Sequence, residues 1–396
     1  MGKKYIYIGY CVPKEHEEKA SGLSVAGNKM QLSIVHELSK YDDIELYPIT
    51  IYPCASYPRD KHLIYKEAKI KLFDSCIALQ VRFVNLPMLK QLCQILEVFC
   101  NVKKMVKENP DIELLTFNMY PQVGSPSCWI KKIYRNRITS IVADLPIDIK
   151  EDRSFFSRII MNKFNAITKK NLEEVDKAIV LNENAKLQYL NTNEYIVVEG
   201  GIDVSELEDD DLHIANYENR DRIIIYSGAL TEYNGIRNLI DAMQLVQEDV
   251  VLRIYGDGPL REVVESAAIK GKKIEYMGSV SNDQMLQLQR TAYLLINPRP
   301  INDPISQVTF PSKIFEYLLS GTVILTTRLS GFTVDYLDKM KFMGDDPYSM
   351  ARAIDDCMKI SYENMSNMAV KAREFAINRK SWAKQVKRIH DFLIES

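Results

Sequence analysis

The stretch TFPSKIFEYLLSGTVILTT, from Thr309 to Thr327, predicts a short helix that runs directly into a buried strand. Thr309 is expected as the N-cap, and Pro311 lies in the first turn, where its missing N–H leaves no hydrogen bond unmade. Gly321 is expected to end the helix, and the β-branched run from Thr322 to Thr327 is typical of a buried strand. Such a helix-to-strand unit indicates a layered α/β fold.

Polar side chains share one arc of this helix. At 100° per residue, the apolar face and the polar arc separate cleanly. The apolar face contains Ile314, Phe315, Leu318 and Leu319, and the polar arc contains Ser312, Lys313, Glu316 and Ser320. From this segment alone two interpretations stay open. The arc is either the solvated side of an amphipathic helix or a surface that contacts a ligand.

The length and composition of the chain are typical of a two-domain protein. Its 396 residues fit two domains of ordinary size, and 46% of hydrophobic residues suffices for two cores. The net charge is −2, whereas proteins that bind nucleic acid are usually clearly basic. We therefore expect no nucleic-acid partner.

The cysteines and histidines follow no metal-ligand spacing. The five histidines are dispersed, so no metal site is expected. An odd, scattered set of cysteines points to a reducing compartment. The seven cysteines are Cys11, Cys54, Cys76, Cys93, Cys100, Cys128 and Cys357. No apolar run reaches about 18 residues, and MGKKYIYIGY enters a strand without a signal-peptide core, so we expect a cytoplasmic location.

Strand-like runs alternate with helical patterns along the chain, which favours parallel sheets covered by helices. In the first half the expected strands are 5–10, 44–52, 113–118, 138–144, 178–181 and the run 195–203, and the expected helices are 28–39 and 87–107. In the second half the expected strands are 223–228, 250–258, 273–278 and 293–298, with a helix starting near Gly235. The acidic segment 206–219 is expected to link the halves.

The same architecture is therefore expected twice, as two Rossmann-like domains at 1–198 and 199–378. A terminal helix at 379–396 follows. In it, SWAKQVKRIHDFLIE puts Trp382, Val386, Ile389 and Leu393 on one stripe, with Ser381 as a cap.

The second half contains several junctions at which a strand, a glycine and a helix follow one another. In open α/β sheets the ligand binds at the carboxyl ends of the strands, and helix N-termini there suit phosphate oxygens. The junctions are Ser227-Gly228, Gly256-Asp257-Gly258, Gly278-Ser279 and Pro311-Ser312. YGDGPL lacks the third glycine of a dinucleotide fingerprint, so a nucleotide phosphate is the better expectation.

The order of these blocks resembles a known family. GGID, YSGALTEYNGIRNLIDA, LRIYGDGPL, IEYMGSV, LLINPRP and FPSKIFEYLLSGTVIL are similar to the donor-binding half of retaining glycosyltransferases of family 4, which have the GT-B fold. The likeness is strong over 197–327 and loose in the first half. It implies two Rossmann-like domains with parallel sheets facing a central cleft, an acceptor-binding first domain, a donor-binding second domain, and a C-terminal helix that crosses back to the first.

The resemblance assigns roles to the polar arc. It implies that Glu316 hydrogen-bonds the ribose hydroxyls of a nucleotide sugar and that the helix start at Ser312-Lys313 faces the diphosphate. It also implies that the loop Gly278-Ser279-Val280 holds the base through its backbone. The remaining donor-binding positions that we assign are Gly22, Ser227, Gly228, Gly256 and Pro311.

Three positions depart from the family pattern. Val308 stands where the family usually has a second glutamate, and Ala229 and Asn234 stand where it has an arginine and a lysine that neutralise the diphosphate. One charge pair at about 4 Å is worth roughly 4 kcal/mol at an effective dielectric of 20. We therefore expect Arg299 and Lys313 to replace these cations, with a solvated loop arginine as the alternative for Arg299.

The first half offers fewer candidate residues. The family often places a histidine after a central strand, where ITSIVADLPID has Asp144 instead. Asp144 either positions the acceptor hydroxyl or caps the following turn. Gly22 and Gly27 either let the backbone approach the diphosphate or only shape a loop.

The segment 151–170 is amphipathic, with Phe156, Ile160, Phe164 and Ile167 in one row among basic residues. This pattern is compatible with an anionic membrane surface that presents a lipid-linked acceptor. Packing on its own domain is the alternative.

Together these features predict a metal-independent glycosyltransferase without a cofactor. It is expected to move a sugar from a nucleotide-sugar donor to a hydroxyl of a glycan or lipid-linked acceptor, with retained configuration. The expected context is cell-surface glycan assembly. The expected catalytic residues are Lys313, Arg299 and Asp144, and the expected location is cytoplasmic, with association at the inner face of the membrane left open. The alternatives are an inactive GT-B subunit that binds a partner or donor, and a nucleotide-sugar epimerase or hydrolase.

Overall fold

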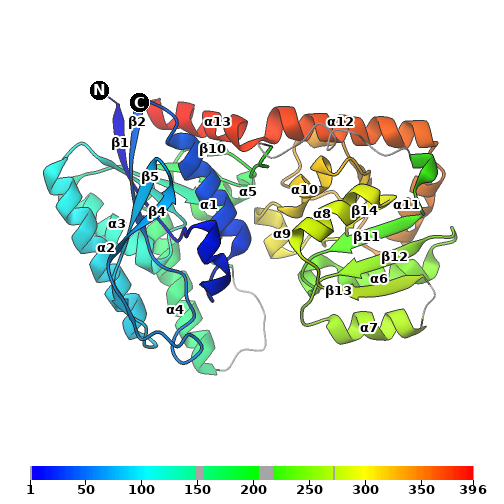
Figure 1. The fold of residues 1–396 in the computed structure, drawn as a ribbon, viewed down its shortest axis with the longest axis horizontal. Coiled ribbons are helices and arrows are strands. Elements are labelled where there is room, and N and C mark those ends of the chain that lie inside the picture. The colour runs from blue at the N-terminus through cyan, green and yellow to red at the C-terminus, as the bar shows by residue number, and fades with distance from the viewer. Residues whose placement is uncertain (1, 148–154, 205–216, 271–272, 396) are drawn as a thin grey trace. The chain divides into compact units, whose positions relative to one another are not determined.

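The computed structural model describes residues 2–147, 155–204, 217–270 and 273–395, which form two compact units. Unit 1 comprises Met1–Glu199 and Gln385–Ser396, and unit 2 comprises Gly200–Lys384. Each unit contains one large sheet with helices packed on it (Figure 1). The predicted α/β architecture with two Rossmann-like units is confirmed.

Unit 1 is built on an eight-stranded sheet with the order β10-β9-β8-β7-β1-β2-β5-β4. All neighbouring strands are parallel except β4, which runs antiparallel to β5 at the edge. The strands are β1 (Lys3–Gly9), β2 (Ile44–Thr50), β4 (Ala68–Phe73), β5 (Cys76–Gln80), β7 (Glu113–Phe117), β8 (Ile138–Val142), β9 (Lys177–Val180) and β10 (Glu194–Val197). Two short strands, β3 (Ile64–Tyr65) and β6 (Phe83–Val84), flank β4 and β5 in the sequence and form a separate antiparallel pair.

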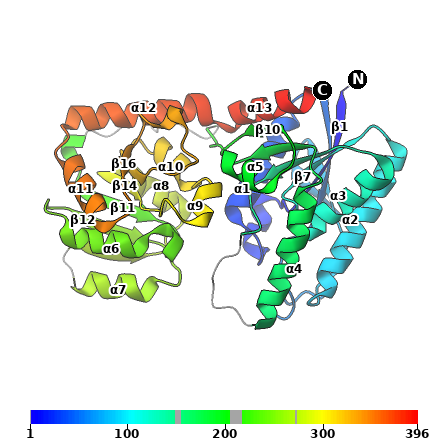
Figure 2. The ribbon, with the colours of Figure 1, turned by 180° about the vertical axis from the view of Figure 1, so that it is seen from behind.

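The helices of unit 1 connect these strands. They are η1 (Lys14–Lys19), α1 (Val25–Leu38), α2 (Leu89–Glu108), α3 (Pro121–Tyr134), α4 (Phe155–Leu172) and α5 (Glu183–Tyr189). Right-handed crossovers place α1 on one face of the sheet and α2, α3 and α4 on the other, because the chain changes direction across β1. Helix α3 packs against both α2 and α4, and Figure 2 shows α3 beside these two helices.

Unit 2 is built on a six-stranded, entirely parallel sheet with the order β13-β12-β11-β14-β15-β16. Its strands are β11 (Ile223–Ser227), β12 (Val251–Tyr255), β13 (Ile274–Gly278), β14 (Leu294–Asn297), β15 (Ile324–Thr327) and β16 (Lys341–Met343). Its helices are η3 (Tyr217–Asn219), η4 (Glu232–Asn234), α6 (Ile236–Leu245), α7 (Arg261–Lys270), α8 (Asn282–Thr291), α9 (Pro304–Val308), α10 (Lys313–Leu319), η5 (Val334–Tyr336), α11 (Pro347–Met358) and α12 (Tyr362–Lys380).

The strand orders define where a ligand fits in each unit. In unit 2 the chain moves outward from β11 to β13 and then returns to place β14 on the other side of β11. In unit 1 the same reversal lies between β1 and β7. In open α/β sheets, ligands bind at the carboxyl ends of the strands beside such a switch point. The expected sites are therefore the ends of β11 and β14 and the ends of β1 and β7.

The last helix, α13 (Trp382–Ile394), begins directly after Ser381. All four residues of the predicted stripe are buried, and the part of the helix from Gln385 onward belongs to unit 1. The carbonyl oxygen of Leu393 accepts hydrogen bonds of 2.8 Å from both Lys3 Nζ and Tyr5 Oη. These donors satisfy a carbonyl that the end of the helix would otherwise leave unpaired.

The start of the helix that opened the sequence analysis was predicted wrongly. Thr309 is the C-cap of the preceding helix α9, whose own N-cap is Asp303, and α10 begins only at Lys313. The strand that follows begins at Ile324 rather than at Thr322. Of the expected acidic linker, 206–216 lies outside the described residues, and Tyr217 is already part of the core of unit 2.

None of the helices in the described residues is both long enough and apolar enough to span a bilayer.

Candidate functional site at the strand ends

Three glycines stack at the carboxyl ends of β11, β12 and β13. Gly228, Gly256 and Gly278 all have positive φ angles, of 147°, 133° and 69°. The N–H of Gly256 donates to the carbonyl of Gly278 at 2.8 Å, and a side chain at Gly256 would collide with the carbonyl of Gly228. The loops therefore approach each other as bare backbone, which only glycine permits.

Lys313 extends from the start of α10 to the end of β11. Its Nζ lies 3.4 Å from the hydroxyl of Tyr226 and 4.4 Å from the centre of that ring. A Cβ atom at Gly228 would collide with the same Nζ. The glycine backbone thus leaves the space in which the lysine ammonium lies. Both the positive φ of Gly228 and its closeness to Lys313 therefore require a glycine at this position.

The charge on Lys313 is unfavourable in the unliganded protein. The pKa of Lys313 is lowered from 10.5 to about 7, chiefly by burial and also by the nearby charge of Arg299, while Glu316 acts in the opposite direction. An amine that loses hydration and faces another cation favours its neutral form. A bound anion would restore the charged form. The site is therefore electrostatically prepared for a negatively charged ligand.

Arg299 follows β14 on the other side of the switch point. Its Nη1 donates to Thr309 Oγ1 at 3.3 Å, and its guanidinium lies 5.8 Å from the centre of the Tyr233 ring. Its Nε is buried and has no hydrogen-bond partner within the described residues. Burial lowers the pKa of Arg299, and arginine still remains charged. A buried guanidinium with an unused donor is costly unless a ligand pairs with it.

Ala229 and Asn234, which replace two cations of the family pattern, shape the loop after β11. The carbonyl of Ala229 accepts from Asn234 Nδ2 at 2.8 Å and from Tyr226 Oη at 2.9 Å. Gly235, with a φ of 75°, lies so close to the carbonyl of Pro298 that a side chain there would collide with it. These contacts hold the loop against the segment that follows β14. Neither Ala229 nor Asn234 supplies a positive charge.

The other residues of the polar arc differ in exposure. Glu316 is partly buried in the first turn of α10, three residues after Lys313, so both side chains lie on one face of the helix. Ser312 is exposed and Pro311 is buried. Val308 is buried, with 3% of its surface exposed. The arc is therefore neither a fully solvated face nor a part of the core.

Ser227 is held by internal hydrogen bonds. Its Oγ lies 3.1 Å from the hydroxyl of Tyr317 and accepts from Gln289 Nε2 at 3.4 Å, and its N–H donates to the same tyrosine at 3.2 Å. The side chain therefore fixes the end of β11 against α8 and α10. Ser279 and Val280, which follow β13, are exposed. Their loop is open to a ligand at this end of the sheet.

In unit 1, Asp144 lies just after β8, beside the strand that borders the switch point. Its Oδ2 accepts hydrogen bonds from Tyr120 Oη at 3.1 Å and from Asn118 Nδ2 at 3.3 Å. The carbonyl oxygen of the Asn118 side chain accepts in turn from the N–H groups of Ala143 and Asp144. Asp144 keeps solvent contact, yet the surrounding protein raises its pKa, while both hydrogen bonds act to lower it. Two neighbouring side chains therefore orient the carboxylate of Asp144.

The two glycines of the first loop have structural explanations within unit 1. A Cβ at Gly22 would lie 2.8 Å from the backbone of Cys54, so this glycine is needed where two loops touch. Gly27 donates its N–H to Ser24 Oγ at 3.2 Å, which caps α1. Neither contact requires a ligand. The donor-binding role assigned to Gly22 stays a prediction.

Aromatic partners were not anticipated from the sequence. Tyr226, Tyr233 and Tyr120 each contact a predicted charged residue, and Asn118 adopts a φ of 60° to orient Asp144. A tyrosine at the end of an apolar strand looks like a core residue in a sequence. The positive φ of Asn118, just after β7, marks an unusual backbone position that could point to a site. A backbone angle cannot be read from the sequence, so this signal was not accessible.

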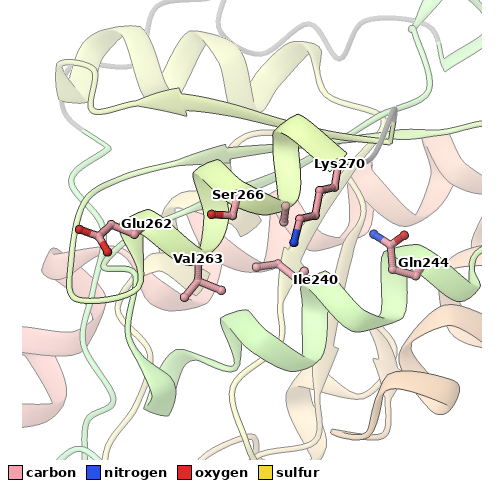
Figure 3. A pocket seen from close by; sticks show the side chains of 7 residues that line it. Ile240, Gln244, Glu262, Val263, Ser266 and Lys270 are labelled. Atoms are coloured by element: carbon pink, nitrogen blue, oxygen red, sulfur yellow. The ribbon is translucent and has the colours of Figure 1, made fainter.

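One surface depression lies away from the strand ends. It has a volume of about 530 Å³ and is an open trough between α6 and α7 (Figure 3). Its lining residues are Ile240, Gln244, Glu262, Val263, Ser266, Ala267 and Lys270. These helices cover the sheet, whereas the candidate site lies at the strand ends, so we do not assign a ligand to the trough. The described residues also contain no group of three or more His, Cys, Asp or Glu side chains that could hold a metal ion.

Comparisons with known proteins place this geometry in context. Residues 221–359 match the family described as "Glycosyl transferases group 1". The sucrose-phosphate synthase of Thermosynechococcus elongatus has a similar structure, with 12% identity, a TM-score of 0.66, and coverage of 99% of this chain and 98% of that chain. No curated protein matches the sequence.

Two further solved structures are similar over nearly the whole chain. The lipopolysaccharide outer core galactosyltransferase WaaB in its apo form has 12% identity and a TM-score of 0.66, and 98% of this chain and 99% of that chain are covered. Anabaena HepE in complex with UDP has 13% identity and a TM-score of 0.63, with the same coverage. At such identities these matches establish the fold. The family match over unit 2 agrees with the resemblance that the sequence blocks suggested.

Proposed function

We infer that this chain, whose residues 221–359 form a group 1 glycosyltransferase domain, is a retaining glycosyltransferase that moves a sugar from a nucleotide-sugar donor to a hydroxyl acceptor. The family match supports this enzyme class, and the two-unit fold is compatible with it. The donor residues, the acceptor and its pathway are our proposal. Enzymes of this family use nucleotide sugars and typically need no metal ion.

The observation that carries the proposal is the pair of cationic side chains at the switch point of unit 2. Burial lowers the pKa of both Lys313 and Arg299, the charge of Arg299 also lowers the pKa of Lys313, and Arg299 keeps an unused buried donor. Such an arrangement costs stability in the free protein. A diphosphate would neutralise both charges and accept the unused N–H. We propose that these two residues replace the cations missing at Ala229 and Asn234.

We assign the remaining contacts to the nucleotide sugar from where the side chains and glycines lie around Lys313. Glu316 lies one helical turn after Lys313, where a carboxylate can accept two ribose hydroxyl hydrogen bonds. The backbone of Gly228 and Gly256 approaches without side chains, as phosphate oxygens require. The exposed loop after β13, with Ser279 and Val280, is proposed to contact the base. HepE, whose structure was solved with UDP, supports a uridine nucleotide as the first donor to test.

The transfer step needs little from the protein beyond position and charge. The bond between the sugar C1 and the leaving phosphate oxygen breaks, and the acceptor oxygen bonds to C1 on the same face. The acceptor proton passes to an oxygen of the leaving diphosphate. Lys313 and Arg299 would stabilise the negative charge that develops on that diphosphate. Asp144, held by Tyr120 and Asn118, would accept a hydrogen bond from an acceptor hydroxyl and orient it.

We propose a glycan or lipid-linked acceptor and a role in cell-surface glycan assembly at the cytoplasmic side. The similarity to WaaB, a lipopolysaccharide galactosyltransferase, supports this context. An inactive donor-binding subunit is the second candidate, because Val308, Ala229 and Asn234 stand where the family pattern has three charged side chains. A nucleotide-sugar epimerase or hydrolase is a further alternative on the same fold.

Calorimetric titration with UDP, GDP and ADP tests the donor site. The parent is expected to bind one nucleotide best, and Lys313→Ala to weaken that binding by about tenfold or more. Lys359→Ala, at an exposed position of the same unit, serves as the matched control and should bind like the parent. Equal binding by all three proteins would contradict the site. Conversion of the donor without any acceptor would favour the epimerase or hydrolase.

A further inference from the structure

Helix α2 exposes three leucines and buries two polar residues near its start. In its first half, Lys90 and Gln94 are buried at 8% and 2% exposure, and Lys90 Nζ donates to the carbonyl of Cys54. The outward face carries Leu89, Leu92 and Leu96, which are 42%, 53% and 48% exposed. The spacing of these leucines, three and four residues apart, forms one stripe along the helix. In this first half the pattern is the reverse of an ordinary helix on a soluble domain, whereas the second half buries Val98, Val102 and Val106.

The stripe continues onto α3. Phe99 of α2 packs edge-on against Trp129 of α3, with their ring centres 5.7 Å apart. Trp129 is 42% exposed, and Ile133, one turn further on, is 57% exposed. Lys103 Nζ lies over the Phe99 ring at 5.6 Å. Aromatic and aliphatic side chains beside a lysine are typical of surfaces that enter the boundary between lipid headgroups and acyl chains.

Helix α4 shows the same inversion. Asn165 and Thr168 are buried, whereas Ile160 and Ile167 are 55% and 43% exposed. The sequence predicted one apolar row through this helix, and among its described side chains only Phe164 turns inward, where it contacts Tyr120. Phe156 and Arg153 of that prediction lie outside the described side chains. Packing on its own unit therefore does not explain the exposed isoleucines.

The three helices are strongly basic. Together α2, α3 and α4 carry ten lysines and arginines against two glutamates, whereas the whole chain has a net charge of −2. Lys131 and Lys132 pair with Asp176 and Glu174. Several others make no ion pair within the described residues. They are Lys104, Lys107, Lys163, Lys169 and Lys170.

We propose that the layer of α2, α3 and α4 is a docking surface for an anionic lipid bilayer. The exposed leucines, isoleucines and Trp129 would enter the headgroup boundary, and the unpaired lysines would face lipid phosphates. A second copy of the chain is a poorer partner, because a two-fold contact would bring the same basic helices of both copies together. The surface belongs to unit 1 alone and does not depend on the donor site.

Sedimentation with lipid vesicles tests this inference without any donor. One set of vesicles contains phosphatidylcholine alone, and the other contains about 30% phosphatidylglycerol. The parent should bind the second set and lose binding as the ionic strength rises from about 0.1 M to about 1 M, because the Debye length falls from about 10 Å to about 3 Å. Leu92→Glu/Leu96→Glu and Ile160→Glu should each require about tenfold more lipid for half-binding.

The matched control is Ile269→Glu on α7 of unit 2, where Ile269 is 86% exposed and therefore tolerates a charge. It should bind vesicles like the parent. All variants should keep nucleotide binding, which separates this surface from the donor site. Absence of binding to anionic vesicles, or equal binding by the Leu92 and Leu96 variant, would overturn the proposal. So would a dimer in light scattering that the same variant dissociates, since the surface would then hold a second copy.

Discussion

The ammonium group of Lys313 lies over the ring of Tyr226, 4.4 Å from its centre and 3.4 Å from its hydroxyl. The face of the ring partly compensates the charge of a lysine that has lost most of its hydration. The hydroxyl of Tyr226 donates to the carbonyl of Ala229, so its oxygen remains available to the lysine. The two residues come from α10 and β11, and together they place the amine of Lys313 at the switch point before any ligand arrives.

Binding of a nucleoside diphosphate should therefore take up protons near pH 8. In the free protein, burial and Arg299 hold the pKa of Lys313 at about 7, so most molecules lack that proton at pH 8. A bound diphosphate should raise the pKa again. Titration calorimetry in two buffers of different ionisation enthalpy measures the uptake. Identical heats in both buffers, or the same uptake by Lys313→Met, would rule out this coupling.

The same lysine should lower the stability of the free fold. Its folded pKa lies below the unfolded value, so the unfolded state binds more protons between about pH 7 and pH 10.5, and stability rises with pH across that window. Lys313→Met should therefore melt at a higher temperature than the parent at about pH 7, and the difference should shrink toward pH 10. Thermal unfolding at both pH values checks this. A variant that melts lower at neutral pH would contradict it.

Glu316→Gln should weaken binding of both the donor and the free nucleoside diphosphate. An amide can accept only through its oxygen, whereas the carboxylate can accept both ribose hydroxyls. The variant should keep its melting temperature, because Glu316 is partly exposed. The matched control is the nucleobase-free ligand pyrophosphate, whose binding should not change. Unchanged nucleotide affinity would return Glu316 to an ordinary surface role.

Removal of α13 should destabilise unit 1. The helix buries Val386, Ile389 and Leu393, and its last turn accepts hydrogen bonds from Lys3, Tyr5 and Lys177. A chain that ends at Lys380 would expose this apolar surface and leave those donors unpaired. Differential scanning calorimetry should show a lower melting temperature than the full chain. An unchanged transition would mean that the helix contributes nothing to the unit.

The sheets were predictable because central parallel strands are buried on both faces and therefore read as apolar runs. YIYIG in β1 and IIIYS in β11 are clear examples. Helix α3 was not foreseen, since PQVGSPSCWI contains Gly124 and Pro126, which disfavour a helix locally. Its packing between α2 and α4 overrides that preference.

The candidate site was predictable only in part. Lys313 and Glu316 stood out because they interrupt an otherwise apolar helix next to a strand. The extra helix α9 was missed, and this error placed the helix start at Thr309. Contacts between distant segments, such as Tyr226 with Lys313 or Tyr120 with Asp144, depend on the sheet order. Nothing in a single sequence specifies such pairs.

The most direct test of the account measures single-turnover transfer by the parent, Lys313→Ala, Arg299→Ala and the double variant with a matched donor and acceptor. Each single change should slow transfer by about 10²-fold or more, as removal of one preorganised stabiliser does. The double change should be less than multiplicative, because both cations would act on one diphosphate. If neither single change slows transfer beyond about threefold, the replacement of the missing cations by Lys313 and Arg299 is contradicted.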